Sequence, residues 1–146
     1  MNEFTITTVI RRPADEVFAV ITDVDRTPLW MPGLSEAHIT SDGPLETGSA
    51  LIYQGTFLGR GYESHAVCTG LTENKHFATE MTNGPFYLET DAVLEPVPDG
   101  TRVTTTCRGE SRGFFKLAEP LVVRLSKKLW ENGAENLRTL MEDHAL

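Results

Sequence analysis

Hydrophobic positions near the start of the chain follow two different periods. Residues 4–10 alternate apolar and polar side chains, and this period of two predicts a strand. Pro13 then leads into an acidic turn, and from Val17 onward apolar residues recur at helical spacing. We therefore expect a strand followed directly by a short helix. A second short helical turn is expected within residues 25–30, ended by Pro28 or by the next proline, because proline breaks a helix interior.

The middle of the chain reads as a series of strands separated by turn-forming residues. Runs rich in β-branched and aromatic residues alternate with Asp-Gly-Pro, Gly-Arg-Gly, Glu-Asn-Lys and Asn-Gly-Pro segments. Such even spacing is typical of an antiparallel meander. The expected strands cover residues 35–40, 49–58, 62–69, 76–82, 86–95 and 102–108.

Alternation indicates which side of these strands faces inward. Thr79, Thr90 and Thr105 fall on the same side as the apolar residues of their strands. The phase of strand 62–69 is ambiguous, because two sets of residues fit an inner face. The first set is Ser64, Ala66 and Cys68, which we favour, and the second is His65, Val67 and Thr69.

The end of the chain predicts one long amphipathic helix of about thirty residues. Gly133 and Asn136 fall on its apolar side. A glycine inside a helix costs about 1 kcal/mol relative to alanine, so the space opposite Gly133 is expected to hold either a ligand or a large side chain such as Trp30 or Phe57. The apolar side comprises Phe114, Ala118, Leu121, Val122, Leu125, Leu129, Leu137 and Leu140.

Four segments give the chain a family resemblance: residues 13–18 (Pro-Ala-Asp-Glu-Val-Phe), 22–25 (Thr-Asp-Val-Asp), 28–32 (Pro-Leu-Trp-Met-Pro) and 112–115 (Arg-Gly-Phe-Phe). With them the chain resembles the START-like superfamily, also called SRPBCC, which includes polyketide cyclase/dehydrase-type and Bet v 1-like proteins. The resemblance implies an α+β helix-grip fold over residues 1–146 as a single domain. In that fold a curved antiparallel sheet of about seven strands surrounds a long C-terminal helix, two short helices follow the first strand, and an apolar cavity lies between sheet and helix. The resemblance does not identify the activity of the protein, because one fold can serve many functions.

Charge and composition narrow the classes of partner. Thirteen basic residues against 21 acidic ones give a net charge of −8, which disfavours nucleic acid and anionic lipid surfaces. No apolar stretch approaches the roughly 18 residues that a membrane span needs. We expect a soluble, cytoplasmic protein, monomeric or homodimeric, that does not insert into membranes.

The two cysteines fit no metal-ligand spacing, and we expect no metal or organic cofactor. In the strand order implied by the resemblance, Cys68 and Cys107 lie on strands separated by two others. At about 4.8 Å per strand they are too far apart for a disulfide, so two small buried thiols are expected.

Large aromatic residues and inward threonines are the candidates for lining a cavity. The aromatic residues either build core or bound a pocket. The threonines either bond locally to backbone or water, or they orient a ligand carbonyl or hydroxyl. The candidate ligand-binding residues are Trp30, Tyr53, Phe57, Phe77, Thr79, Phe86, Thr90, Thr105, Leu129, Gly133 and Asn136.

Acid–base chemistry has three candidates in this sequence, namely His65, Tyr53 and Tyr62. A neutral imidazole at His65 could move a proton to a polyketide-like carbonyl, whereas the alternative is an ordinary exposed strand histidine. No hydrolase triad, paired-histidine metal motif, phosphate loop or dinucleotide fingerprint is present.

Three functions fit these observations. The first is binding of a small hydrophobic or aromatic ligand, lipid-like or polyketide-like, between the sheet and the C-terminal helix. The second is a polyketide cyclase/dehydratase-type enzyme, in which the shape of the cavity folds the substrate. The third is a non-catalytic protein-interaction module.

Overall fold

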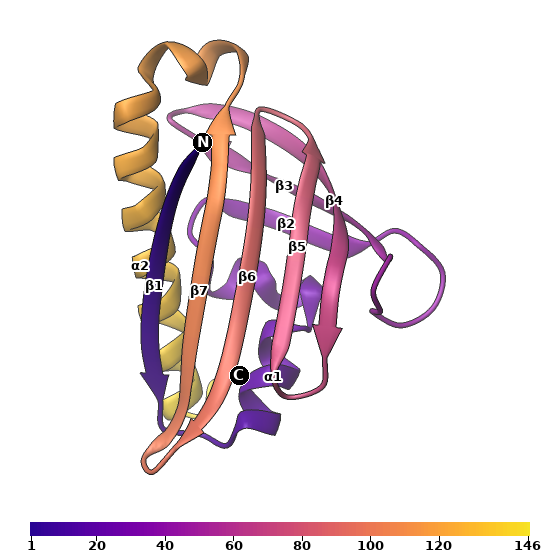
Figure 1. Ribbon diagram of the computed structural model, residues 1–146, viewed down its shortest axis with the longest axis vertical. Coiled ribbons are helices and arrows are strands. Elements are labelled where there is room, and N and C mark those ends of the chain that lie inside the picture. The colour runs from indigo at the N-terminus through magenta and orange to yellow at the C-terminus, as the bar shows by residue number, and fades with distance from the viewer.

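Seven antiparallel strands form one sheet in the order β1-β7-β6-β5-β4-β3-β2 in the computed structural model, which describes residues 1–146. The long helix α2 runs along one side of this sheet (Figure 1), and the predicted helix-grip fold is confirmed. The strands are β1 (Asn2–Ile10), β2 (Leu34–Ile39), β3 (Ala50–Phe57), β4 (Arg60–Thr72), β5 (His76–Asn83), β6 (Phe86–Val97) and β7 (Gly100–Ser111). The helices are α1 (Ala14–Ile21), η1 (Val24–Leu29), η2 (Gly113–Ala118) and α2 (Glu119–Glu142), of which η1 and η2 are 3-10 helices.

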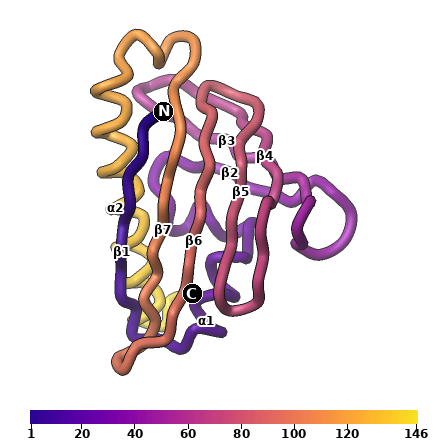
Figure 2. The backbone as a smooth tube through the Cα atoms, viewed as in Figure 1, coloured from indigo at the N-terminus to yellow at the C-terminus, as the bar shows by residue number.

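The sheet curves strongly because its longest strand is irregular. The pairing of β4 with β5 shifts between His65 and Ala66 and again between Cys68 and Gly70. An extra residue in one strand bends that strand and increases its twist. The β2–β3 hairpin therefore crosses behind the other strands, and the loop between β2 and β3 projects beyond the sheet (Figures 1 and 2).

The two short helices after β1 have local causes. Pro13 has an extended backbone conformation and directly precedes α1. The carboxylates of Asp15 and Glu16 lie in the first turn of α1, where they interact favourably with the positive end of the helix dipole. The second helical turn is the 3-10 helix η1. Our expectation that proline would end this turn was wrong for Pro28, which lies inside η1. A 3-10 turn this short has few backbone bonds to lose to a proline.

A tight hairpin joins β3 to β4 and sets the phase of β4. Its two loop residues, Leu58 and Gly59, have positive φ angles of 51° and 76°, as a two-residue turn between twisted strands requires. Ser64, Ala66 and Cys68 are buried, so the favoured phase is confirmed.

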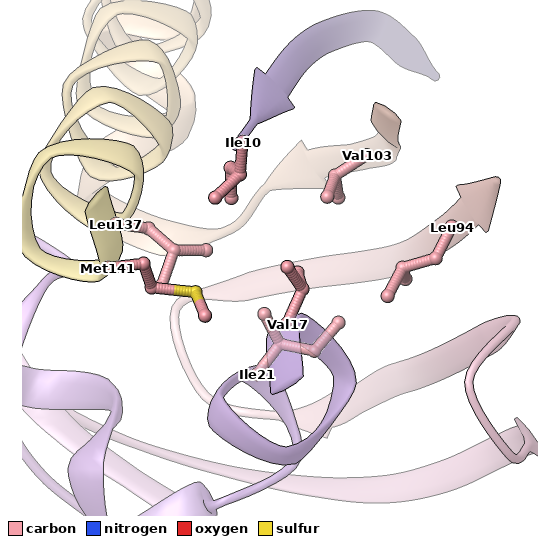
Figure 3. Close-up of a cluster of buried hydrophobic side chains, with 7 residues drawn as sticks. All are labelled: Ile10, Val17, Ile21, Leu94, Val103, Leu137 and Met141. Atoms are coloured by element: carbon pink, nitrogen blue, oxygen red, sulfur yellow. The ribbon is translucent and has the colours of Figure 1, made fainter. Parts of the chain in front are cut away.

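The main core closes one end of the space between sheet and α2. Side chains from five elements point toward one another there (Figure 3). Trp30 and Ala92 pack against the same cluster. Burial of this much apolar surface fixes α1 and the last turns of α2 against the sheet. The cluster comprises Ile10, Val17, Ile21, Leu94, Val103, Leu137 and Met141.

The inward face of α2 is rotated from the face predicted. Val122, Gly133, Leu137 and Met141 are buried, whereas Leu121 is 39% exposed. The helix begins only at Glu119, and the preceding residues 113–118 form η2 with its own orientation. The prediction counted one continuous helix from residue 114. The predicted apolar face is therefore rotated about the helix axis from the face that is buried in the structure.

The cysteines Cys68 and Cys107 are free and buried. They lie on β4 and β7, which β5 and β6 separate, so no disulfide forms between them. None of the helices has the length and apolar character needed to cross a membrane.

Candidate ligand-binding cavity

A cavity of about 230 Å³ lies between the inner face of the sheet and α2. Of its 36 lining residues, 24 are hydrophobic. Ile10, Ile21 and Leu137 of the main core form part of its wall, and Asn2 and Glu110, both exposed, lie at its rim. The cavity is therefore closed by packed core toward the end of α2 and reaches the surface toward its start.

Aromatic side chains form much of the wall, as the sequence predicted. Phe57 and Tyr62 both meet Phe86 edge to face, with ring centroids 5.5 Å and 6.0 Å apart. Phe86 in turn stacks on Phe115 of η2 at 5.1 Å. Such pairs hold one another in fixed orientations, so this part of the wall has a defined shape. The predicted residues that line the cavity are Trp30, Tyr53, Phe57, Tyr62, Phe77, Thr79, Phe86, Thr90, Thr105 and Leu129.

The three inward threonines line the cavity, and two of them bond to each other. Thr79 and Thr90 face each other across β5 and β6, and their hydroxyl oxygens lie 2.6 Å apart. One hydroxyl donates in this bond, so the other keeps its own proton for a further acceptor. Thr105 also lines the cavity and has no side-chain hydrogen bond within the protein. The wall thus carries hydroxyls free to bond to a ligand.

Two phenols and one indole add further donors. Burial raises the pKa of Tyr53, and the neighbouring Cys68 raises it further; burial likewise raises the pKa of Tyr62. Both phenols are therefore neutral donors near pH 7. The Nε1–H of Trp30 is buried without an acceptor, which is an unfavourable state for a polar group.

Charge is nearly absent from the lining. Glu110, at the rim, is the one charged residue among the lining residues. Burial raises the pKa of Cys107, also in the wall, to about 12, so its thiol is protonated at neutral pH. The cavity is suited to a neutral, largely apolar occupant.

Two predicted ligand-binding residues lie outside the cavity. A Cβ added at Gly133 would lie 3.1 Å from Sδ of Met31 and 3.5 Å from Cδ of Pro32, so side chains of this protein occupy the space opposite the glycine. Asn136 is exposed, and its Nδ2 donates to the backbone oxygen of Trp30 at 3.1 Å. Both residues anchor the segment between η1 and β2 to α2, because the rotation of the helix turns them away from the cavity.

His65 also lies outside the cavity, which contradicts its proposed role as a proton shuttle there. Its side chain is 53% exposed on the outer face of β4 and lies 3.2 Å from Glu63. The reason is the phase of β4, which turns Ser64 and Ala66 inward. Of the three acid–base candidates, only Tyr53 and Tyr62 reach the cavity.

The helical part of the wall was only partly predicted from the sequence: Val122 and Leu129 lie on the predicted apolar side, whereas Ser126 and Ala134 do not. Ser126, Trp130 and Ala134 line the cavity from α2, together with Val122 and Leu129. Ser126 and Ala134 have small side chains, so a search for large apolar residues passes over them.

The three tyrosines of the chain predict an unusual alkaline titration. Besides Tyr53 and Tyr62, Tyr87 donates to Glu89 at 2.6 Å, and this hydrogen bond raises its pKa to about 12. Tyrosine in an unfolded chain ionises near pH 10. Above that pH the unfolded state releases protons that the folded state still holds, so the free energy of unfolding falls as the pH rises. Ultraviolet absorbance should show no tyrosinate step near pH 10 while circular dichroism still reports the native fold; a step there would contradict these burial and bonding assignments.

The curved sheet and the long helix, with an apolar cavity between them, define a domain of the START-like helix-grip fold. A family model described as polyketide cyclase / dehydrase and lipid transport matches residues 1–142, and the chain belongs to that family. No curated protein matches the chain.

Solved structures show the same fold at low sequence identity. A START superfamily protein from Mycobacterium smegmatis is 20% identical, with a TM-score of 0.82 and 97% of each chain covered. The Zhui aromatase/cyclase from Streptomyces sp. R1128 is 12% identical, with a TM-score of 0.85, covering 99% of this chain and 96% of that one. At these identities the likeness concerns the fold.

Proposed function

We propose that this protein binds one small, mostly apolar molecule with an aromatic part and one or two oxygen atoms, in the cavity between the sheet and α2. The observation that carries the proposal is the cavity itself, enclosed by hydrophobic residues and supplied with a few polar groups. Ligand sites in proteins combine these two properties. Membership of a family named for cyclisation and lipid transport supports the same function.

The volume limits the size of the ligand. An apolar cavity of about 150 Å³ is known to hold benzene, so 230 Å³ suits a molecule of about one or two rings, or a short branched chain. A larger ligand would have to extend through the rim or displace side chains. We therefore expect tightest binding for bicyclic compounds.

Polar groups on opposite walls define how the ligand is oriented. The sheet carries the hydroxyls of Thr79, Thr90 and Thr105, and Trp30, after η1, lines the cavity with its Nε1–H buried and without an acceptor. A carbonyl or phenolic oxygen on the ligand would give that buried N–H the acceptor that it lacks. An entirely apolar ligand of the same size should bind more weakly, because these groups would stay unpaired.

Binding is the first function because, apart from the carboxylate of Glu110 at the rim, the lining offers donors rather than a base. Proton removal near pH 7 needs a group with a pKa near that value, and the phenols and the thiol of the wall are all shifted to higher pKa. Cyclase or dehydratase chemistry is the second candidate, with Tyr53 and Tyr62 as neutral donors to a developing oxyanion. Conversion of a bound polyketide-like chain that is lost in Tyr62→Phe would establish it.

Native mass spectrometry of the protein purified from its own host tests the proposal. A retained small mass, absent from the denatured protein, is the expected result and would identify the ligand. Calorimetric titration with naphthol, which has two fused rings and one hydroxyl, should then show one site with a negative change in heat capacity. A protein that carries no small mass and binds neither naphthol nor other one- or two-ring compounds would contradict the proposal and favour the protein-interaction role.

A further inference from the structure

A second, open groove lies at the start of α2, beside the cavity. It is lined by Arg60 and Gly61 at the start of β4, by Gly84 and Pro85 in the turn between β5 and β6, and by residues 112–115. The backbone N–H of Arg112 donates to the oxygen of Pro85 at 2.8 Å, which joins two sides of the groove. Three segments far apart in the sequence thus meet there.

The groove and the cavity share one wall. Tyr62 lines both of them. Phe86, which lines the cavity, stacks on Phe115, which lines the groove. Aromatic rings therefore lie between the apolar interior and the groove.

Two arginines of this groove have no carboxylate partner. Arg60 and Arg112 form no ion pair, although acidic residues outnumber basic ones 21 to 13. Lys116, close by, already pairs with Glu119 at 2.7 Å. Both guanidinium groups are thus free to pair with an added anion, although the carboxylate of Glu110 lies at the neighbouring cavity rim.

Each of the two guanidinium groups lies over an aromatic ring. Cζ of Arg60 lies 4.2 Å from the ring centroid of Phe114, and Cζ of Arg112 lies 5.7 Å from that of Tyr87. Contact with a ring face leaves the N–H groups at the edge of a guanidinium free to donate. Tyr87 itself lines the cavity, which places Arg112 beside the rim.

We propose that the groove lined by Arg60 and Arg112 binds a carboxylate of the ligand whose apolar part occupies the cavity. Because this inference rests on the proposed function, it narrows the ligand class to amphipathic acids: an aromatic or aliphatic body joined by a short chain to a carboxylate. The planar fork of arginine matches the two oxygens of that group. Without this groove the net charge of −8 would disfavour any anionic ligand.

Matched acids and amides test this inference. Phenylbutanoate, phenylhexanoate and phenyloctanoate are each titrated beside the corresponding neutral amide by calorimetry, and the ratio of the two affinities is the measurement. At the chain length that spans from cavity to groove, the acid should bind about 10-fold more tightly than its amide. This advantage should shrink as the salt concentration rises.

Substitution of the two arginines tests whether they cause the higher affinity of the acid. In Arg60→Gln and Arg112→Gln the advantage of the acid should fall several-fold, and it should vanish in the double variant, because the acid loses more affinity than the amide. Arg124→Gln is the matched control, because Arg124 is exposed, unpaired and remote from the groove lining, so the same loss of charge should leave the ratio unchanged.

The possible outcomes separate the two proposals. Amides that bind as tightly as acids at every chain length would overturn the carboxylate site and leave the cavity as a ligand site. An equal loss in Arg124→Gln would also overturn it, since the preference would then come from overall charge. If neither acids nor amides bind, the proposed function falls and the carboxylate site with it.

Discussion

Replacement of Ala134 by phenylalanine is expected to weaken ligand binding by about 100-fold or more, while the protein stays folded. Ala134 lines the cavity from α2, and a ring the size of benzene would occupy most of its 230 Å³. A loss of 100-fold corresponds to about 2.7 kcal/mol of binding free energy. Calorimetric titration of Ala134→Phe with the ligand identified by mass spectrometry, or with naphthol, measures this loss.

Two further variants make the result specific. Ala92→Phe fills the same cavity from β6 and should weaken binding to a similar extent. Lys127→Phe places the same ring on the exposed side of α2 and should bind ligand like the unaltered protein. Undiminished binding in both cavity variants would show that the ligand lies elsewhere. Gly133→Leu does not serve this purpose, because the added side chain would collide with Met31 rather than enter the cavity.

The sheet side of the cavity was predictable from the sequence because strands have a simple period. Once the phase of a strand is known, every second residue lines the interior, and so Thr79, Thr90 and Phe77 were placed correctly. In β4 two sets of residues could have faced inward: the small residues at 64, 66 and 68, or the set that includes the imidazole at 65. The burial of Ser64 and Ala66 shows that residue size, rather than hydrophobicity alone, indicated the inner face.

The helix side was harder to predict for a physical reason. A helix that bounds a cavity is not lined by large apolar residues throughout, because side chains must leave room for the ligand. Ser126 and Ala134 leave this room, whereas Leu121 is largely turned to solvent. The change from η2 to α2 before residue 119 also resets the helical register, and no feature of the periodicity marks that change.

Close approaches between backbones were not predictable at all. Gly55 reads as a weak residue in the middle of a strand, and only the structure shows why it is there. The start of β2 pairs with β3 at this point, beside a shift in the register of that pairing. Thr56 donates its N–H to the oxygen of Gly33 at 2.8 Å, so the two backbones are in direct contact.

Gly55→Ala is expected to lower the free energy of unfolding by about 3 kcal/mol, the upper range for overpacking. A Cβ at this position would lie only 2.3 Å from the backbone oxygen of Gly33, and a backbone atom has no rotamer by which to move away. For a chain of this length the loss corresponds to a fall in Tm of roughly 6–12 °C. Thermal unfolding followed by circular dichroism measures it.

Gly61→Ala is the matched control for this steric argument. Gly61 lies in the neighbouring strand β4, and a Cβ there would have no heavy atom nearer than the backbone oxygen of Gly55 at 3.9 Å. Alanine in a strand is favoured over glycine by about 0.5–1 kcal/mol, so Gly61→Ala should unfold at the same temperature as the unaltered protein or slightly higher. Equal Tm values for the two variants would contradict the close approach of the two backbones. Met31 and Pro32 of the cavity wall directly precede Gly33, so Gly55→Ala should also weaken ligand binding in the fraction that remains folded.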